Sequence, residues 1–148
     1  MNASEADDFA PKLVLDTNAA LDWLVFVDPG MVTLASAVEG GRVRWLVSPR
    51  MREELTRTLS YPSLARWKPD SERVLSHFDR WARVCPEPLT PPAAALICTD
   101  PDDQVFVDLA LTQGARWLVT HDRALHKLAR HAAPRGLRIV RPKDWRPE

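Results

Sequence analysis

The sequence is short of the features that would assign it to several large classes of protein. Its 148 residues include only Cys85 and Cys98 as cysteines, which are too few for a disulfide framework and lack metal-site spacing. No apolar stretch approaches the roughly 20 residues that a membrane-spanning helix requires. The acidic N-terminus lacks the apolar segment of a signal peptide. We therefore expect a cytoplasmic protein with buried free thiols and no membrane partner.

Neither sign of charge is in excess over the whole chain. Twenty basic residues balance twenty acidic ones, so no global field attracts nucleic acid. The distribution is nevertheless uneven, because residues 1–30 are mainly acidic and the segment from Arg116 onward is mainly basic. This asymmetry permits a polyanion-binding surface beside an acidic site, although solvated surface arginines explain it equally well.

Internal repeats and low-complexity tracts are also missing, and the length suits one domain. We expect residues 1–11 to form a flexible leader and residues 12–148 to form a single domain. Short apolar runs predict strands at 13–16, 43–47, 116–120 and 137–140. Helical patterns lie between them, after Asp16 and over 31–39, 49–60, 70–82, 100–114 and 123–131, and an extended connection carries Pro86, Pro88, Pro91 and Pro92. This alternation predicts an α/β fold, with helices on both faces of a mostly parallel sheet.

Four acidic residues lie where separate segments of this fold should meet. Asp16 ends the first strand, Glu54 lies on the helix after the second, Asp103 opens a later helix, and Asp122 follows the third strand. A strand that stops on an aspartate places a carboxylate at the rim of the sheet, where open α/β folds bind ligands. Carboxylates gathered there repel one another unless a cation neutralises them, and oxygen ligands suit Mg²⁺ or Mn²⁺.

Each acid also has a purely structural explanation. Asp16 and Asp122 are good capping or turn residues, and acids near Asp103 complement the dipole of the helix that they open. Glu54 lies on a helix among arginines, as solvated surface glutamates do, and Glu53 stands beside it. The helical period favours Glu54 as the glutamate that faces inward.

Taken together, these motifs resemble those of the PIN-domain nucleases. The resemblance rests on Leu-Val-Leu-Asp16-Thr-Asn, on Glu54 in Arg-Glu-Glu-Leu, on Asp103 before Gln-Val-Phe-Val-Asp-Leu-Ala, and on Thr-His-Asp122. It extends over about Leu13 to Trp145. The chain is most similar to the bacterial subgroup that supplies the toxins of toxin–antitoxin pairs, through Cys98-Thr-Asp-Pro-Asp-Asp and Pro142-Lys-Asp-Trp.

The resemblance implies a three-layer α/β/α sandwich and metal-dependent hydrolysis of RNA by an endoribonuclease. Asp16, Asp103 and Asp122 would bind Mg²⁺ or Mn²⁺. Glu54 would complete a second metal position or orient the attacking water.

Further groups would support this catalytic set. Asn18 and Thr120 would fix the carboxylates, and Asn18 could instead donate to a phosphate oxygen. Arg50 and Arg52, on the same helix as Glu54, would contact RNA phosphates without reading the sequence. The implied partner is an antitoxin protein that is encoded separately, and a homodimer is also possible.

Two other classes of function stay open. Phosphotransferases with an aspartyl nucleophile also carry an Asp after the first strand, but they usually need a second Asp two residues later, where this chain has Asn18. A catalytically silent PIN-like module would keep the acidic fold and bind RNA or protein. Metal-dependent cleavage that is lost on Asp16→Asn would exclude the silent module, and trapping a phospho-aspartate at Asp16 would favour the phosphotransferase.

Overall fold

The computed structural model describes residues 9–88 and 96–147, and within them one five-stranded sheet has the order β3-β2-β1-β4-β5. Every neighbouring pair is parallel. The strands are β1 (Lys12–Leu15), β2 (Arg44–Val47), β3 (Ala82–Val84), β4 (Trp117–Val119) and β5 (Arg138–Val140). From β1 the chain builds outward through β2 to β3, and then returns to the other side of β1 for β4 and β5.

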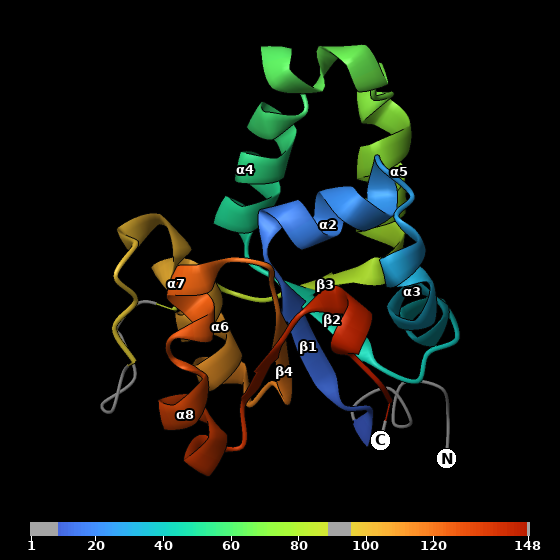
Figure 1. The fold of residues 1–148 in the computed structure, drawn as a ribbon. Helices are drawn as coiled ribbons and strands as arrows, with labels where there is room; N and C mark the ends of the chain where they lie inside the picture. Colours follow the sequence, from blue (N-terminus) through green and yellow to red (C-terminus); the bar gives the residue numbers. More distant parts are fainter. Residues whose placement is uncertain (1–8, 89–95, 148) are drawn as a thin grey trace.

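Helices cover both faces of this sheet, which confirms the predicted three-layer α/β/α fold (Figure 1). The first group occurs in the sequence between β1 and β3 and consists of α2 (Thr17–Leu24), α3 (Val32–Glu39), α4 (Pro49–Thr58) and α5 (Ser71–Trp81). The second group consists of α6 (Gln104–Gln113), α7 (Arg123–His126) and α8 (Ala129–Ala132). Short 3-10 turns join them: η1 (Pro29–Met31), η2 (Pro62–Trp67), η3 (Pro101–Asp103), η4 (Ala133–Arg135) and η5 (Pro142–Asp144).

The core lies on both sides of the central strands. Leu13 is the register partner of both Trp45 and Trp117, so these three side chains point to the same face. Aromatic rings meet there in three contacts, of Trp23 with Trp45, Phe78 with Trp45, and Trp145 with Trp117. The uninterrupted apolar runs of the sequence are therefore strands that have helices packed on both faces. The two cysteines are buried and free, as expected.

A helical arm, defined as residues 49–81, rises past the carboxyl ends of the strands (Figure 1). It consists of α4 and α5, which η2 joins at the far end. Ser48 caps α4 by accepting a hydrogen bond from the Met51 backbone N–H (3.4 Å), with Pro49 in the first turn, as the sequence predicted. Asp70 caps α5 through the Arg73 N–H (3.1 Å).

The structure differs from the predicted elements in two places. β3 follows α5 directly and was not predicted, because this three-residue edge strand includes Arg83 and an exposed Val84. The predicted helix over 123–131 is split into α7 and α8. Its Leu128 and His131 N–H groups bond three residues back, a 3-10 pattern that interrupts the helix. The predictions for residues 1–8 of the leader, and for Pro91 and Pro92, lie outside the described residues.

Within the described segments, no single helix has the length and apolar character needed to cross a membrane. Only α2 taken together with Pro29–Glu39 passes that test on length and composition, and these two segments are bent by 105° at the break between them. Their apolar residues include Leu21 and Leu34, which are buried in the core.

Candidate active site

The carboxyl ends of β1 and β4 lie side by side at the point where the strand order reverses. Asp16 follows β1, and its backbone N–H donates to the Val119 carbonyl at the end of β4 (3.2 Å). Thr120 and Asp122 follow β4 directly. Crevices of this kind hold the ligands of open α/β sheets, because the connections leave the sheet in opposite directions there.

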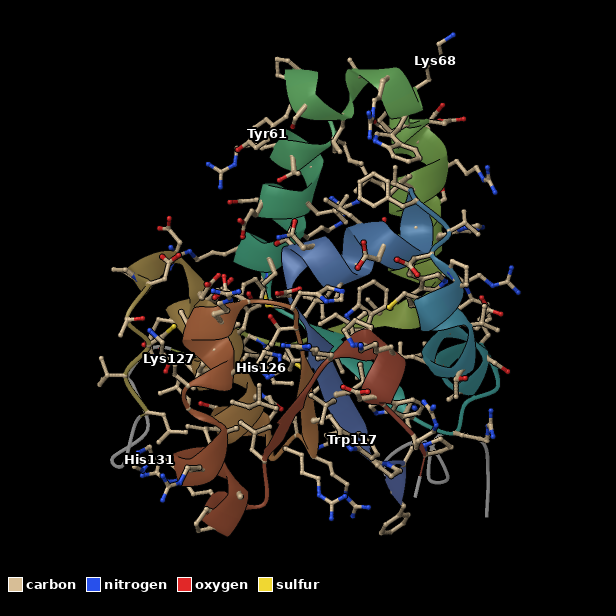
Figure 2. All side chains as sticks on the ribbon, viewed as in Figure 1. Tyr61, Lys68, Trp117, His126, Lys127 and His131 are labelled. Carbon is tan, nitrogen blue, oxygen red and sulfur yellow. The ribbon has the colours of Figure 1, made fainter. Side chains whose placement is uncertain are left out.

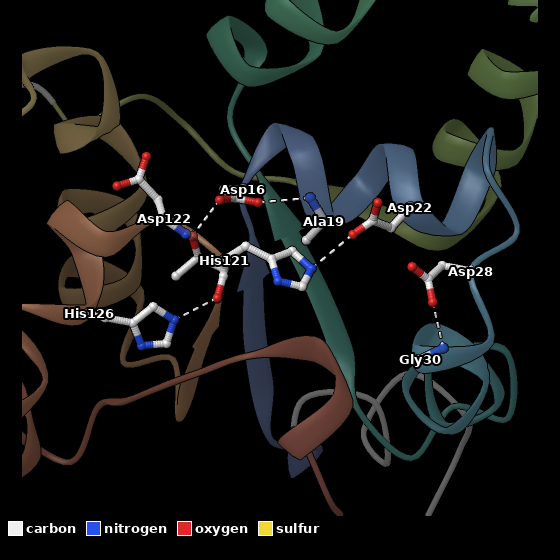
Figure 3. A network of polar contacts seen from close by, with 9 residues as sticks. Asp16, Ala19, Asp22, Asp28, Gly30, His121, Asp122 and His126 are labelled. Atoms are coloured by element: carbon white, nitrogen blue, oxygen red, sulfur yellow. Dashed lines mark hydrogen bonds and ion pairs between the residues drawn. The ribbon is translucent and has the colours of Figure 1, made fainter. Parts of the chain in front are cut away.

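Asp16 is buried and held by hydrogen bonds to both carboxylate oxygens (Figure 3). Its Oδ1 accepts from the Ala19 N–H (2.8 Å), and its Oδ2 accepts from Thr120 Oγ1 (2.5 Å). The same Thr120 oxygen accepts from the Asp122 N–H (2.9 Å), so one buried hydroxyl ties the ends of two strands together. Burial raises the pKa of Asp16, and the hydrogen bonds from Thr120 and Ala19 partly oppose that rise.

Three more carboxylates converge next to Asp16. One oxygen from each of Asp100, Asp103 and Asp122 lies within 4.8 Å of the other two. Asp103 Oδ2 is buried and has no hydrogen-bond partner among the described residues. Burial, then the neighbouring Asp122 carboxyl, and then the charges of Asp100 and Asp16 raise the pKa of Asp103 from 3.8 to about 7. Among the described residues, no positively charged group is a cause that lowers this pKa.

Asp16, Glu54, Asp103 and Asp122 line a single cavity of about 310 Å³, called here the acidic cavity. Four separate segments of the chain thus deliver one carboxylate each. Glu54 comes from α4 and is half-buried, whereas the adjacent Glu53 is exposed and lines neighbouring cavities instead. No lysine, arginine or histidine is among the described residues that line the acidic cavity.

The other predicted polar residues are placed differently from one another. Asn18 is exposed and lines the acidic cavity, whereas Arg50 lines a second cavity of about 470 Å³ that shares Glu54 with it. Arg52 is not brought to the site, because two helical positions turn it away from Glu54. Its guanidinium donates to both carboxylate oxygens of Asp79 on α5, at 2.8 Å each.

Two features of the site went beyond the sequence prediction. Asp100 was not among the predicted site residues, and it caps the turn that it opens, since its Oδ1 accepts from the Asp102 N–H (3.0 Å). It also joins the carboxylate group, and its presence in the Asp-Pro-Asp-Asp motif was the available signal. His121 Nε2 lies 3.0 Å from Asp22 Oδ2, beside the acidic cavity and outside its lining (Figure 3).

The family model for the PIN domain matches residues 12–124, so the chain belongs to the PIN-domain family. The matched range includes all four predicted acids. No curated protein sequence matches the chain. A solved structure that it resembles is VapBC2 from Rickettsia felis bound to a DNA fragment from their promoter. The identity is 15% and the TM-score 0.57, over 86% of this chain and 96% of that chain, a likeness that concerns the fold.

The donor set fits a hard divalent cation. Every candidate ligand atom is a carboxylate oxygen, the type that Mg²⁺ and Mn²⁺ prefer. The buried Asp103 Oδ2 has no partner among the described residues, and a cation would supply one. A cation would also lower the mutual repulsion that raises the pKa of Asp103.

Proposed function

We propose that this protein is a Mg²⁺- or Mn²⁺-dependent endoribonuclease and the toxin of a type II toxin–antitoxin pair. The observation that carries the proposal is the convergence of four carboxylates from four segments in one cavity whose described lining has no basic side chain. Membership of the PIN-domain family supports it. The resemblance of the sequence motifs to the toxin subgroup supports the biological role.

In this proposal Asp16, Asp103 and Asp122 hold the cation, with Asp100 close enough to join them. When bound, the cation would neutralise the phosphoryl oxygens of RNA and lower the pKa of a water molecule. Glu54 faces the cavity from the arm and would orient the attacking water and accept its proton. Thr120 keeps Asp16 and the Asp122 backbone in fixed relation, so that the carboxylates are positioned before the substrate arrives.

The neighbouring groups would handle the rest of the substrate. Asn18 at the acidic cavity would donate to a phosphate oxygen, and Arg50 would contact the strand in the adjoining cavity. Arg52 would contact RNA only after leaving Asp79, so we assign it a structural role in joining α4 to α5.

We further propose a separately encoded antitoxin as the protein partner, and the cytoplasm as the compartment. The motif resemblance supports this partner, and the fold likeness to VapBC2 is consistent with it. A homodimer is compatible with the exposed apolar side chains of Val27 (75% exposed) and Val32 (65% exposed).

Cleavage of a labelled single-stranded RNA by the purified protein tests the nuclease proposal. We expect cleavage with Mg²⁺ or Mn²⁺, none with EDTA, and none for Asp16→Asn. Asp28→Asn is the matched control, because Asp28 Oδ1 also caps a turn (Gly30 N–H, 2.8 Å) but lies outside the acidic cavity. Cleavage by Asp16→Asn at the wild-type rate would refute the proposal. Inactivity with every metal would favour the silent binding module.

A further inference from the structure

The lining of the acidic cavity combines two kinds of group. Its carboxylates come from the ends of β1 and β4, from η3 and from α4, and its apolar and aromatic groups include Leu21, Phe26, Tyr61 and Leu64. Tyr61 is the only tyrosine in the chain, and its side chain is 49% exposed. A nucleotide also combines two kinds of group, with an anionic phosphate at one end and a flat base whose faces stack on aromatic rings at the other.

Tyr61 is presented from a fixed turn at the end of α4 (Figure 2). Its N–H donates to the Thr58 carbonyl (3.0 Å), and its carbonyl accepts from the Leu64 N–H (3.0 Å). Pro62 follows it and limits the backbone further. Tyr61 therefore has an anchored backbone and a solvent-accessible ring, which suits a stacking surface.

Tyr61 also lies at the boundary between two cavities. Together with Glu54 it lines both the acidic cavity and the second cavity of about 470 Å³. A chain that passes from one cavity to the other must therefore pass this ring. The acidic cavity, at about 310 Å³, is at the lower end of the roughly 300–1,000 Å³ typical of small-molecule sites. A base that enters it has to leave its stack in a duplex.

We propose that Tyr61 is a positioning residue that stacks on the nucleobase beside the scissile phosphate of an unpaired strand. The strand then continues past Tyr61 into the second cavity. This inference rests on the proposed function and assigns a role to the aromatic part of the same lining. Tyr61 touches the base and not the reacting atoms, and its contribution is to hold the phosphate near the carboxylates.

The charges of the second cavity indicate how the strand is held there. Arg50 and Arg57 are outnumbered by the acids of its lining, which are Glu53, Glu54, Glu87, Asp102 and Asp108. This lining does not attract phosphates by net charge. Its carboxylates can accept hydrogen bonds from the N–H groups of bases, including the N3–H of uracil, so stacking and base-edge contacts dominate. We therefore expect a weaker salt dependence of binding than a basic groove produces.

Binding of fluorescein-labelled ten-nucleotide uridine RNA, followed by anisotropy in Ca²⁺, tests the stacking role. We expect Tyr61→Ala to weaken binding by about tenfold, and Tyr61→Phe to stay within about twofold of wild type, because the phenyl ring keeps the stacking surface. Phe9→Ala is the matched control. Phe9 is 81% exposed and precedes β1, at the opposite end of the sheet.

An abasic oligomer of the same length makes the test specific for the base. Wild-type protein should bind it about tenfold more weakly than the uridine oligomer, and Tyr61→Ala should cause no further loss. An equal effect of Tyr61→Ala on both oligomers would overturn the proposal. So would a Tyr61→Phe variant as weak as the alanine variant, or binding of oligo-arginine but of neither oligomer.

Cleavage kinetics separate failure of this inference from failure of the proposed function. Binding that depends on Tyr61 without cleavage by any metal-loaded sample would refute the nuclease and keep the stacking site. Cleavage by wild type with unchanged KM and Kd in Tyr61→Ala would keep the nuclease and refute the stacking site. If both hold, Tyr61→Ala raises KM more than it lowers kcat for the uridine oligomer.

Discussion

The two ends of the sheet carry charges of opposite sign in different surroundings. The end where the strands begin has the basic residues Lys12, Arg44, Arg116 and Arg138. Of these, Arg116 and Arg138 are exposed, and Lys12 Nζ donates to the Gln113 carbonyl (3.3 Å). The end where the strands finish has acids, and Asp16 there is only 5% exposed. Both ends are made by the same strands, so the difference lies in solvation.

This comparison shows where the fold accepts an electrostatic cost. A charge in contact with water costs little, whereas burial raises the pKa of both Asp16 and Asp103. Chains usually keep such groups apart, and departures from that rule concentrate at functional sites. Under the proposed function, the acidic end is therefore the part of the molecule in which activity and stability oppose each other.

The largest expected effect is the difference between removing a charge at the acidic end and removing one at the basic end. Asp103→Asn should lower the rate of RNA cleavage by about 10²- to 10³-fold, because it removes a proposed cation ligand. Arg138→Gln should leave the rate within about twofold, since it lies at the other end of the sheet. Single-turnover cleavage with saturating Mg²⁺ measures both. Equal losses in the two variants would remove the functional distinction between the ends.

A finer comparison uses adjacent glutamates on the arm. Glu54→Gln should slow cleavage by about 10²-fold, whereas Glu53→Gln should have little effect, because only Glu54 lines the acidic cavity. The same cleavage assay distinguishes them. If Glu53→Gln is the slower variant, the helical face assigned to the active site is wrong.

Thr120 should have an intermediate effect through the carboxylates that it positions. Thr120→Val removes the hydroxyl that donates to Asp16 and accepts from the Asp122 N–H, and should reduce activity by about 10- to 100-fold. Thr120→Ser keeps the hydroxyl and should recover most of the rate. Mg²⁺ titration should show a lower metal affinity for the valine variant alone. Wild-type metal affinity in that variant would contradict the positioning role.

Stability should change in the opposite direction from activity. In EDTA, Asp16→Asn should raise the free energy of unfolding by about 1 kcal/mol, because it removes a buried charge. Arg138→Gln should stay within about 0.5 kcal/mol of wild type, since Arg138 is exposed. Urea denaturation at pH 8 measures both changes. A large loss of stability in Asp16→Asn would show that its hydrogen bonds outweigh the burial of its charge.

Stability should also depend on pH when divalent cations are absent. The folded-state pKa of Asp103, about 7, exceeds its ordinary value of 3.8, so folding favours the protonated form. Its stabilising contribution is full below about pH 4 and is lost as pH rises through 7. Asp103→Asn should flatten the unfolding free energy between pH 5 and 8, and Mg²⁺ should restore stability at pH 8 in wild type only. Parallel pH profiles in EDTA would refute this assignment.

Much of the fold could be predicted because strands that are buried on both faces have continuous apolar sequences. β1 and β2 read as apolar runs that end on polar residues, whereas β3 carries Arg83 and an exposed Val84 at an edge and gives no such signal. The split between α7 and α8 depends on local hydrogen bonding that the apolar pattern does not encode.

The candidate site was harder to predict from the sequence than the fold was. Its acids could be predicted to meet because each lies at a strand end or on a helix that follows one. The order of the strands could not be read from the chain, and so the approach of Asp100 to Asp122 was missed. The pairing of Arg52 with Asp79, 27 residues apart in sequence, depends on contact between two helices. Such pairings arise from tertiary packing and not from local pattern.

The residues of the candidate site come from two parts of the protein. Glu54 and Tyr61 belong to the helical arm, whereas Asp16, Asp103 and Asp122 belong to the sheet and its connections. A small tilt of the arm would therefore open or close the gap between these two sets of groups.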